Sequence, residues 1–303
     1  MNGIEQTLIG GIAGGTAIVI PSLGELTSEL AGIVNLGTEG CMLAGALGAY
    51  AVTVATGSAE IGVAGGAIAG AVFGLLHAYL TIYRKADQLT SGLVVWFLAL
   101  GVTGVLGTSY VNDVITPLPV ISIGGLSKVP WLGPILFHQD LLVYVGYVLV
   151  PLIIFILHRT RIGLLLRSTG ERPEVVSVAG NRPNLIQATA VTIGALLAGV
   201  GGAQLSVGYV GTWFDDMTSG YGFVAVAVVL FASWKPLRVM VGAYIFGVAL
   251  SAESVLQTNG IAINQYLLDA LPYLVTLIAL VIVSRKGGRK APEALNRALI
   301  DVT

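Results

Sequence analysis

The stretch LLVYVGYVLVPLIIFILH, residues 141–158, contains no lysine, arginine, aspartate or glutamate. A helix that crosses the hydrocarbon core of a bilayer needs about 20 predominantly apolar residues. Comparable runs recur along all 303 residues, of which 55% are hydrophobic and only 10% charged. Soluble domains carry about 25% charged residues, so this chain lacks the polar surface of a water-soluble globule. The sequence therefore predicts an all-α polytopic membrane protein.

Outward from this stretch, the apolar runs define nine candidate spans. The first run continues into residues 23–37, which carry Glu25 and Glu29. We interpret this continuation as a surface helix, a re-entrant half-helix or part of a bent span. The chain is thus expected to be one transmembrane domain over residues 1–303 with eight or nine helices. The spans are predicted at residues 5–22, 40–56, 61–80, 91–109, 141–158, 185–207, 213–232, 238–256 and 265–284.

The basic residues predict the orientation of the chain in the membrane. Of the 15 lysines and arginines, all but Lys128 fall into four clusters. Two predicted spans separate each neighbouring pair of clusters, so all four lie on one face, and basic loops stay in the cytoplasm. We therefore expect a cytoplasmic loop at about 159–184, a cytoplasmic C-terminus, and an external segment at about 110–140. This proline- and glycine-rich external segment is either a docking surface or an irregular cap. The clusters are Arg84 and Lys85; Arg159, Arg161, Arg167, Arg172 and Arg182; Lys235 and Arg238; and Arg285, Lys286, Arg289, Lys290 and Arg297.

A weak internal repeat indicates inverted symmetry. The motif Thr90-Ser91-Gly92 returns 128 residues later as Thr218-Ser219-Gly220, and Gly66-Ala67 returns as Gly194-Ala195 at the same offset. The predicted topology gives the two copies opposite directions across the membrane. Inverted repeats are typical of transporters, whose binding or passage sites lie where the copies meet.

Polar residues inside the spans are the candidates for a translocation path. Asn35 and Glu39 lie beside Gly37 and Gly40, which permit a helix break that lines a cavity. Alternatively, Glu39 belongs to an interfacial turn and caps the helix that follows it. We add the serines and threonines of the repeat, so the candidate path residues are Asn35, Glu39, Thr90, Ser91, Thr218 and Ser219.

Several functional classes have no support in the sequence. The charge balance of 15 basic to 16 acidic residues gives no field that would gather nucleic acid. Cys41 is the single cysteine, and the three histidines lack metal-ligand spacing. No phosphate-binding loop and no nucleophile paired with a base are found. We therefore expect a protein without enzyme activity, catalytic residues, a metal site or a cofactor of its own.

The basic loop contains a short helix signal. In Gly170-Glu171-Arg172-Pro173-Glu174, the proline suits a first helical turn and Glu174 suits the positive helix end. Valines and an alanine then give an apolar side before Gly180 ends the helix. A half-exposed helix surrounded by arginines favours a protein partner.

This loop also carries a resemblance to a known family. Residues 164–203, LLLRSTGERPEVVSVAGNRPNLIQATAVTIGALLAGVGGA, resemble the coupling region of permease subunits in ABC importers of the branched-chain amino acid and simple-sugar permease superfamily. Residues 24–40, GELTSELAGIVNLGTEG, are similar to the N-terminal signature of that family, and segments 97–107, 131–140 and 234–247 resemble its nucleoside branch. The departures from the family pattern are Ser177 and the run Asn181-Arg182-Pro183.

The resemblance implies a permease subunit that imports nucleosides or related ribosyl or sugar solutes across a bacterial inner membrane. Its implied partners are an ATP-binding subunit, which holds ATP and magnesium, a second and different permease chain, and an extracytoplasmic solute-binding lipoprotein. The alternative is an ion- or proton-coupled secondary transporter, for which Glu39 and the repeat would be natural. The implied contacts with the ATPase are Glu171, Arg172, Pro173, Glu174, Val178 and Ala179.

Overall fold

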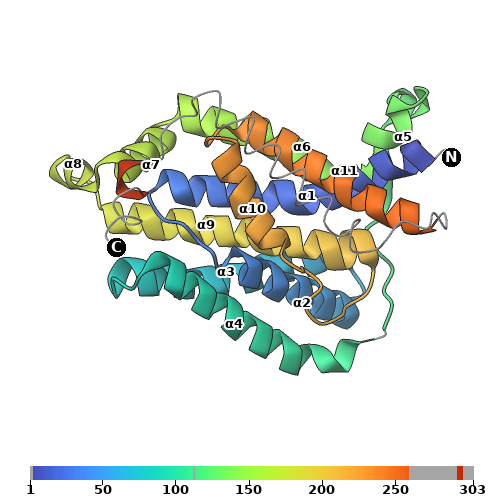
Figure 1. The fold of residues 1–303 in the computed structure, drawn as a ribbon, viewed down its shortest axis with the longest axis horizontal. Helices are drawn as coiled ribbons and strands as arrows, with labels where there is room; N and C mark the ends of the chain where they lie inside the picture. The colour runs from blue at the N-terminus through green and yellow to red at the C-terminus, as the bar shows by residue number, and fades with distance from the viewer. Residues whose placement is uncertain (1–2, 112, 259–291, 296–303) are drawn as a thin grey trace.

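A computed structural model of the chain describes residues 3–111, 113–258 and 292–295. These residues form an elongated bundle of helices (Figure 1). Seven helices within the described ranges are long and apolar enough to cross a membrane, which confirms the predicted all-α polytopic fold. The long helices are α1 (Gly3–Leu30), α2 (Thr38–Thr56), α3 (Ala59–Ala78), α4 (Gln88–Gly107), α6 (Leu141–Arg159), α9 (Pro183–Ala203) and α11 (Pro236–Thr258).

Shorter elements connect the long helices. The short α-helices are α5 (Leu132–Leu136), α7 (Arg161–Glu171), α8 (Pro173–Val178) and α10 (Tyr221–Phe231). Strands β1 (Val120–Ser122) and β2 (His138–Asp140) pair antiparallel, with Val120 opposite Asp140. Helices α3 and α9 each continue into a π-helical turn, at Tyr79–Tyr83 and Gln204–Val210, and 3-10 turns occupy Thr108–Tyr110 and Gly124–Lys128.

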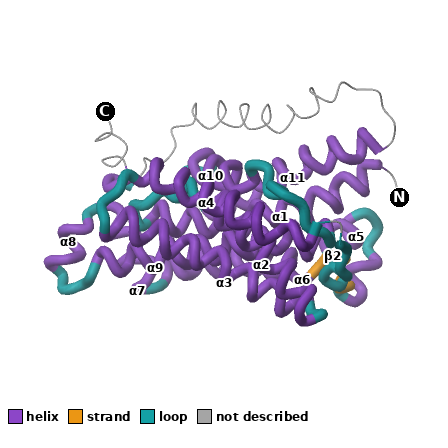
Figure 2. Tube along the Cα trace, turned by 90° about the horizontal axis from the view of Figure 1, so that it is seen from below, coloured by secondary structure: helices purple, strands orange, loops and turns teal. Residues whose placement is uncertain are grey.

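The two ends of the bundle differ. Helices α7 and α8 lie at one end, and α5 lies at the opposite end together with the start of α1 (Figures 1 and 2). Lys85 and Pro173 line one pocket, so the first basic cluster lies at the end that holds α8. The predicted cytoplasmic loop and the predicted external segment are therefore at opposite ends of the molecule.

Two predicted spans are revised by the structure. Helix α1 continues to Leu30, so residues 23–30 extend the first span, and only residues 31–37 connect it to α2. The span predicted at 213–232 is wrong, because residues 211–220 are not helical and α10 has only 11 residues. Gly211 and Gly220, with φ of 73° and 90°, hold the left-handed backbone that separates α9 from α10. The predicted span 265–284 lies outside the described residues.

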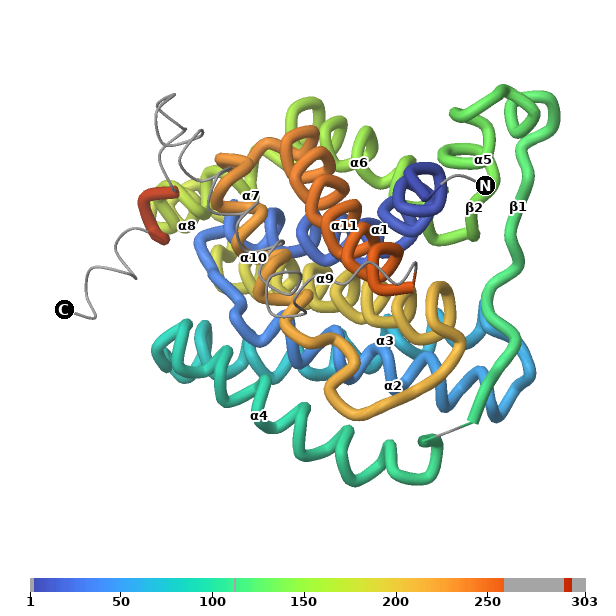
Figure 3. Tube along the Cα trace, turned by 45° about the vertical axis from the view of Figure 1, so that its right-hand side comes forward, coloured from blue at the N-terminus to red at the C-terminus, as the bar shows by residue number. Residues whose placement is uncertain are grey.

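Helix α1 is the centre of the bundle. Most of its residues from Gly11 onward are buried, and it packs against α9, α10 and α11. Helices α2, α3 and α4 lie along its other side, with α4 at the edge (Figure 3). Because apolar side chains face outward on α3, α4 and α6, the outer surface suits lipid.

Helices α3 and α9, which carry the two repeat copies, pack in opposite directions at very short range. A Cβ added at Gly70 would lie 2.7 Å from Gly199 Cα, and one added at Gly66 would lie 3.2 Å from Ala203 Cβ. Small residues allow this close approach of the two backbones. Each helix also ends in a π-helical turn, which fits an inverted repeat.

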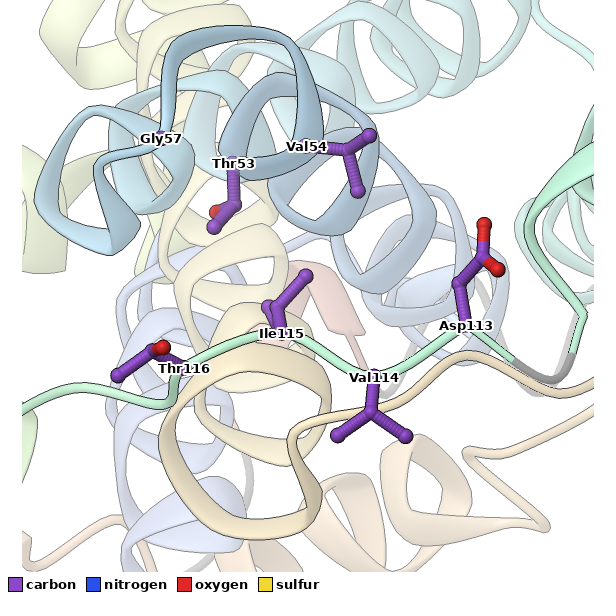
Figure 4. Close-up of a pocket in the computed structure, with 7 residues that line it drawn as sticks. All are labelled: Thr53, Val54, Gly57, Asp113, Val114, Ile115 and Thr116. Atoms are coloured by element: carbon purple, nitrogen blue, oxygen red, sulfur yellow. The ribbon is translucent and has the colours of Figure 1, made fainter.

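An extended segment lies across one end of the bundle. We call residues 113–118 the external strap. Its backbone bonds to the turn after α9, from Ile115 N–H to Gly211 O (3.0 Å) and from Leu118 N–H to Val207 O (2.9 Å). A cavity of about 360 Å³ lies between the strap and the last turn of α2, lined by Thr53 and Asp113 among others (Figure 4). The predicted external segment is thus ordered where it meets the spans.

Candidate functional site

Two helices begin inside the bundle instead of at its ends. Residues 31–37 run along the bundle from the end of α1 before α2 starts at Thr38 (Figure 1). Residues 211–220 do the same before α10 starts at Tyr221. At 1.5 Å per residue, α10 is about 16 Å long, roughly half the hydrocarbon thickness. We call the meeting point of these two helix starts the interior junction, made up of Asn35, Glu39, Thr218, Gly220 and Gly222.

Glu39 binds the start of α10. One carboxylate oxygen accepts the N–H of Gly220 at 2.9 Å, and the other accepts the N–H of Gly222 at 2.5 Å. The side chain is 1% exposed. The first N–H groups of a helix lack partners within the helix, and a carboxylate there is favoured by the helix dipole. Glu39 is therefore a helix cap, but for α10 and not for its own helix α2.

Two further carboxylates, both on α1, hold the neighbouring segments. Glu25 accepts the N–H of Asn35 at 2.8 Å and the hydroxyl of Thr38 at 3.0 Å, which fixes the start of α2. Glu29 accepts the indole N–H of Trp234 at 2.6 Å, which fixes the turn between α10 and α11. Glu25 and Glu39 thus hold the two interior helix starts by hydrogen bonds, and Glu29 holds the turn that follows α10. Buried polar groups in proteins are normally hydrogen-bonded in this way.

The predicted path residues fall into two groups. Asn35, Glu39 and Thr218 are buried at the interior junction, with the Thr218 hydroxyl next to the Glu39 carboxylate. Ser219 is adjacent but exposed, and its hydroxyl donates to Asp216 O. Thr90 and Ser91 lie instead in the first turn of α4, where Ser91 Oγ is 3.3 Å from His77 Nδ1. The first repeat motif reaches the junction through Gly92, where an added Cβ would lie 2.9 Å from Gly37 N, and the second through Gly220, which donates to Glu39.

The start of α4 is stabilised by an acidic cap. Asp87 Oδ1 accepts the N–H of Thr90 at 2.7 Å and its hydroxyl at 2.6 Å. These hydrogen bonds from Thr90 stabilise the charged form and lower the pKa of Asp87 below its ordinary value. Thr90 is thus occupied by a local structural role.

The predicted coupling residues lie on and around α8. Pro173 is the first residue of this helix, and Gly180, with φ of 82°, follows its end as the sequence predicts. Val176 is buried, while Val178 is 90% exposed and Val175 58% exposed. Glu171, Arg172, Glu174 and Ala179 are exposed around this apolar tip. A short helix with exposed valines at the end of the bundle is available to a protein partner.

Sequence reasoning missed several buried polar contacts. Gln204 Nε2 donates to Asp140 Oδ2 at 2.9 Å, and Asp140 also caps α6 through the N–H groups of Leu142 and Val143. Gln88 and Gln187 hydrogen-bond to the backbone of residues 31–34. In the sequence, these residues could be noticed only as amide and acidic side chains at the ends of apolar runs. Their hydrogen-bond partners are distant in sequence and could not be inferred.

A bundle of long apolar helices is the architecture of a polytopic membrane protein, and helices that start in its interior are typical of transporters. The family model described as branched-chain amino acid transport system, permease component, matches residues 7–283. The chain belongs to this family, and it is a permease subunit of an ABC transporter. Members of the family work with an ATPase and further subunits.

Curated relatives cover nearly the whole chain. A putative glucose ABC transporter permease protein of Haloferax volcanii is 34% identical, covering 88% of this chain and 87% of its own. The nucleoside ABC transporter permease protein NupC of Lactococcus lactis is 32% identical and covers 93% of each chain. The guanosine ABC transporter permease protein NupQ of Bacillus subtilis is 32% identical and covers 91% of each. No solved structure matched the chain.

Proposed function

We propose that this permease subunit forms the translocation path for nucleosides or related ribosyl or sugar solutes in an ATP-driven importer. Two of the relatives above are named for nucleosides or guanosine, and one for glucose. These solutes are small, polar and rich in hydroxyl groups. The interior junction supplies hydroxyl, amide and carboxylate groups of matching chemistry, from Asn35, Glu39 and Thr218, with Ser219 beside them. Thr90 and Ser91, the other proposed path residues, lie at the start of α4, where they bond to Asp87 and His77.

The exposed tip of α8 supports an ATP-binding partner at this end of the bundle. Its exposed Val178 and Val175 project from the end of the bundle that carries the basic loop, and they would insert into a groove on a separate ATP-binding subunit. ATP and magnesium would be held by that subunit. A second, different permease chain and an extracytoplasmic solute-binding lipoprotein would complete the complex. We place the complex in the bacterial inner membrane, with the C-terminus and α8 cytoplasmic.

Docking of the ATPase rests on one observation. The tip of α8 exposes valines, and acidic side chains lie on both sides of Pro173. Glu171 and Glu174 are exposed at this tip. Replacing both by lysine reverses the charge of the two side chains and leaves the buried Val176 in place. We expect ATP-dependent uptake to be abolished and the ATPase to separate from the permease during purification, while membrane insertion is unchanged.

The matched control is Glu60→Lys, which reverses an exposed acid in the first turn of α3 at the other end of the bundle. It should leave uptake and co-purification unchanged. Normal uptake by the Glu171→Lys, Glu174→Lys double variant would contradict docking through α8.

A further inference from the structure

Residues 31–37, which we call the interior segment, are held mainly by side chains from other parts of the bundle. Every backbone carbonyl from Ala31 to Val34 accepts a hydrogen bond from a side chain, and the N–H groups of Val34 and Asn35 donate to side chains. The segment is therefore fastened to α1, α3, α4 and α9 at once. The bonds are Gln187 Nε2 to Ala31 O (3.1 Å), Gln88 Nε2 to Gly32 O (3.3 Å), Ser28 Oγ to Ile33 O (2.8 Å), His77 Nε2 to Val34 O (3.1 Å), Val34 N–H to Gln88 Oε1 (2.9 Å) and Asn35 N–H to Glu25 Oε1 (2.8 Å).

Both helices that flank α8 contact the start of this segment. From α9, Gln187 donates to Ala31 O. From α7, Gly170 packs so closely that an added Cβ would lie 3.0 Å from Leu30 C and 3.2 Å from Gly32 N. A pocket of about 560 Å³ separates Gly32 from Pro173, the first residue of α8. A displacement of α8 would therefore be passed to residues 30–32 both through α7, at Gly170, and through α9, at Gln187.

The other end of the interior segment leads into the interior junction. Thr38, the first residue of α2, is bound by Glu25, and the next residue is Glu39, the cap of α10. Gly222 contacts Glu39 so tightly that an added Cβ would lie 2.5 Å from Glu39 N. The start of α10 must therefore follow the start of α2.

We propose that the interior segment transmits the movement of α8 to the starts of α2 and α10, with Gln187 as a positioning residue at its attachment to α9. The inference rests on the proposed function, since it assumes an ATPase that moves α8. The coupling is carried by the hydrogen bonds and close packing that join these elements. Gln187 touches no cargo in this scheme. It determines whether ATP hydrolysis is converted into reorientation of the interior junction.

The test uses the complete complex of permease, ATPase and receptor with the variant Gln187→Met, which keeps the side-chain length and removes the amide donor. The matched control is Thr189→Val on the same helix, because Thr189 bonds only within α9, to Leu185 O. We expect receptor-stimulated ATPase activity to remain in Gln187→Met while solute carried per ATP hydrolysed falls on the order of tenfold. Thr189→Val should keep the wild-type ratio.

Cys41 provides a second readout that a merely structural role of Gln187 would not change. It is the single cysteine of the chain, it is buried, and it lies in the first turn of α2. With cysteine-free partner subunits, N-ethylmaleimide labelling of Cys41 should change rate on addition of a non-hydrolysable ATP analogue. Gln187→Met should abolish this nucleotide dependence, and Thr189→Val should keep it.

The outcomes separate this inference from the proposed function. A wild-type complex without ATP-dependent uptake would refute the proposed function itself. A wild-type complex that transports but shows no nucleotide effect at Cys41, or a Gln187→Met complex with normal coupling, overturns only the inference. If Gln187→Met does not assemble, Gln187→Glu, which also lacks the amide donor, is measured in the same way.

Discussion

Glu39 supplies hydrogen-bond acceptors for the first N–H groups of α10. The N–H of Gly220 is part-buried and that of Gly222 is buried, so access of water to the first N–H groups of α10 is restricted. A buried N–H without a partner is destabilising, and a carboxylate with two acceptor oxygens satisfies two such groups. The residue therefore contributes to structure whether or not it touches cargo.

The first prediction concerns Glu39→Gln. The amide oxygen can accept one N–H of α10, but the amide NH₂ then faces the other N–H and leaves it without a partner. We expect a loss of about 1–3 kcal/mol in stability, measured as a lower melting temperature of the detergent-solubilised protein. Glu60→Gln, at an exposed first turn, is the control and should leave the melting temperature unchanged. Identical melting curves for Glu39→Gln and the wild type would contradict the cap.

The second prediction concerns the charge on Asp87. Its pKa is lowered in the folded protein by the hydrogen bonds from Thr90, so the charge stabilises the fold above the unfolded-state pKa of about 3.9. This contribution is lost as the pH falls through the lower folded-state pKa. Asp87→Asn keeps a capping side chain without charge. The wild type should melt higher than Asp87→Asn at pH 7, and the difference should shrink as the pH falls below about 3.9. A difference that is constant over this range would contradict the assignment.

At the scale of elements, the contact between α3 and α9 is made by glycine and alanine on both sides. At Gly70 an added Cβ would meet the backbone of Gly199, whereas at Gly101 on α4 it would meet no atom within 4 Å. The same residue type thus has different roles at the two positions. Gly101 faces outward, while Gly70 sets the distance between two helices.

The third prediction compares Gly70→Leu with Gly101→Leu. Both introduce the same side chain into an apolar helix, so any effect of helix propensity is shared. Gly70→Leu forces α3 and α9 apart and should destabilise the protein by about 1–3 kcal/mol or prevent its accumulation in the membrane. Gly101→Leu should accumulate normally, as shown by size-exclusion chromatography of the solubilised protein. Equal yields and equal stability would mean that the close contact is absent.

The long elements could be predicted from the sequence because length and apolarity are local properties. Helix α8 was also predictable, since Pro173 and Gly180 mark its start and end. The interior start of α10 was not, because residues 213–232 are apolar enough on average to resemble a span. The bond from Gly220 to Glu39 joins residues 181 positions apart, and no local pattern reveals such a partner. Asn35 and Glu39 were selected as polar residues within the spans and Thr218 as part of the internal repeat, whereas their meeting depends on the packing of α1, α2 and α10.

At the scale of the whole molecule, the described chain consists of a bundle with distinct ends. The exposed tip of α8 lies at one end and the external strap at the other (Figure 1). An importer driven by ATP uses such polarity, with the energy source on one side and cargo delivery on the other. A proton-coupled transporter would instead need ionisable groups that exchange protons along the path.

The fourth prediction separates these two energy sources. In proteoliposomes that contain the full complex, uptake should stop when ATP is depleted with the proton gradient intact. Uptake should persist when only the gradient is collapsed by an ionophore. Radiolabelled guanosine and glucose provide two cargo candidates for the same assay. Uptake that follows the gradient and ignores ATP would support the secondary transporter.

The contact between α3 and α9 limits how the protein can change shape. Backbones that touch through glycine cannot slide past each other or rotate without steric overlap. We therefore expect these two helices to move as one body. Helix α10 is joined to α2 in a comparable way, since Gly222 packs against the backbone of Glu39 and two N–H groups bond to its carboxylate. We therefore expect any movement of α10 relative to α9 to occur within residues 211–220, where Gly211 and Gly220 have positive φ.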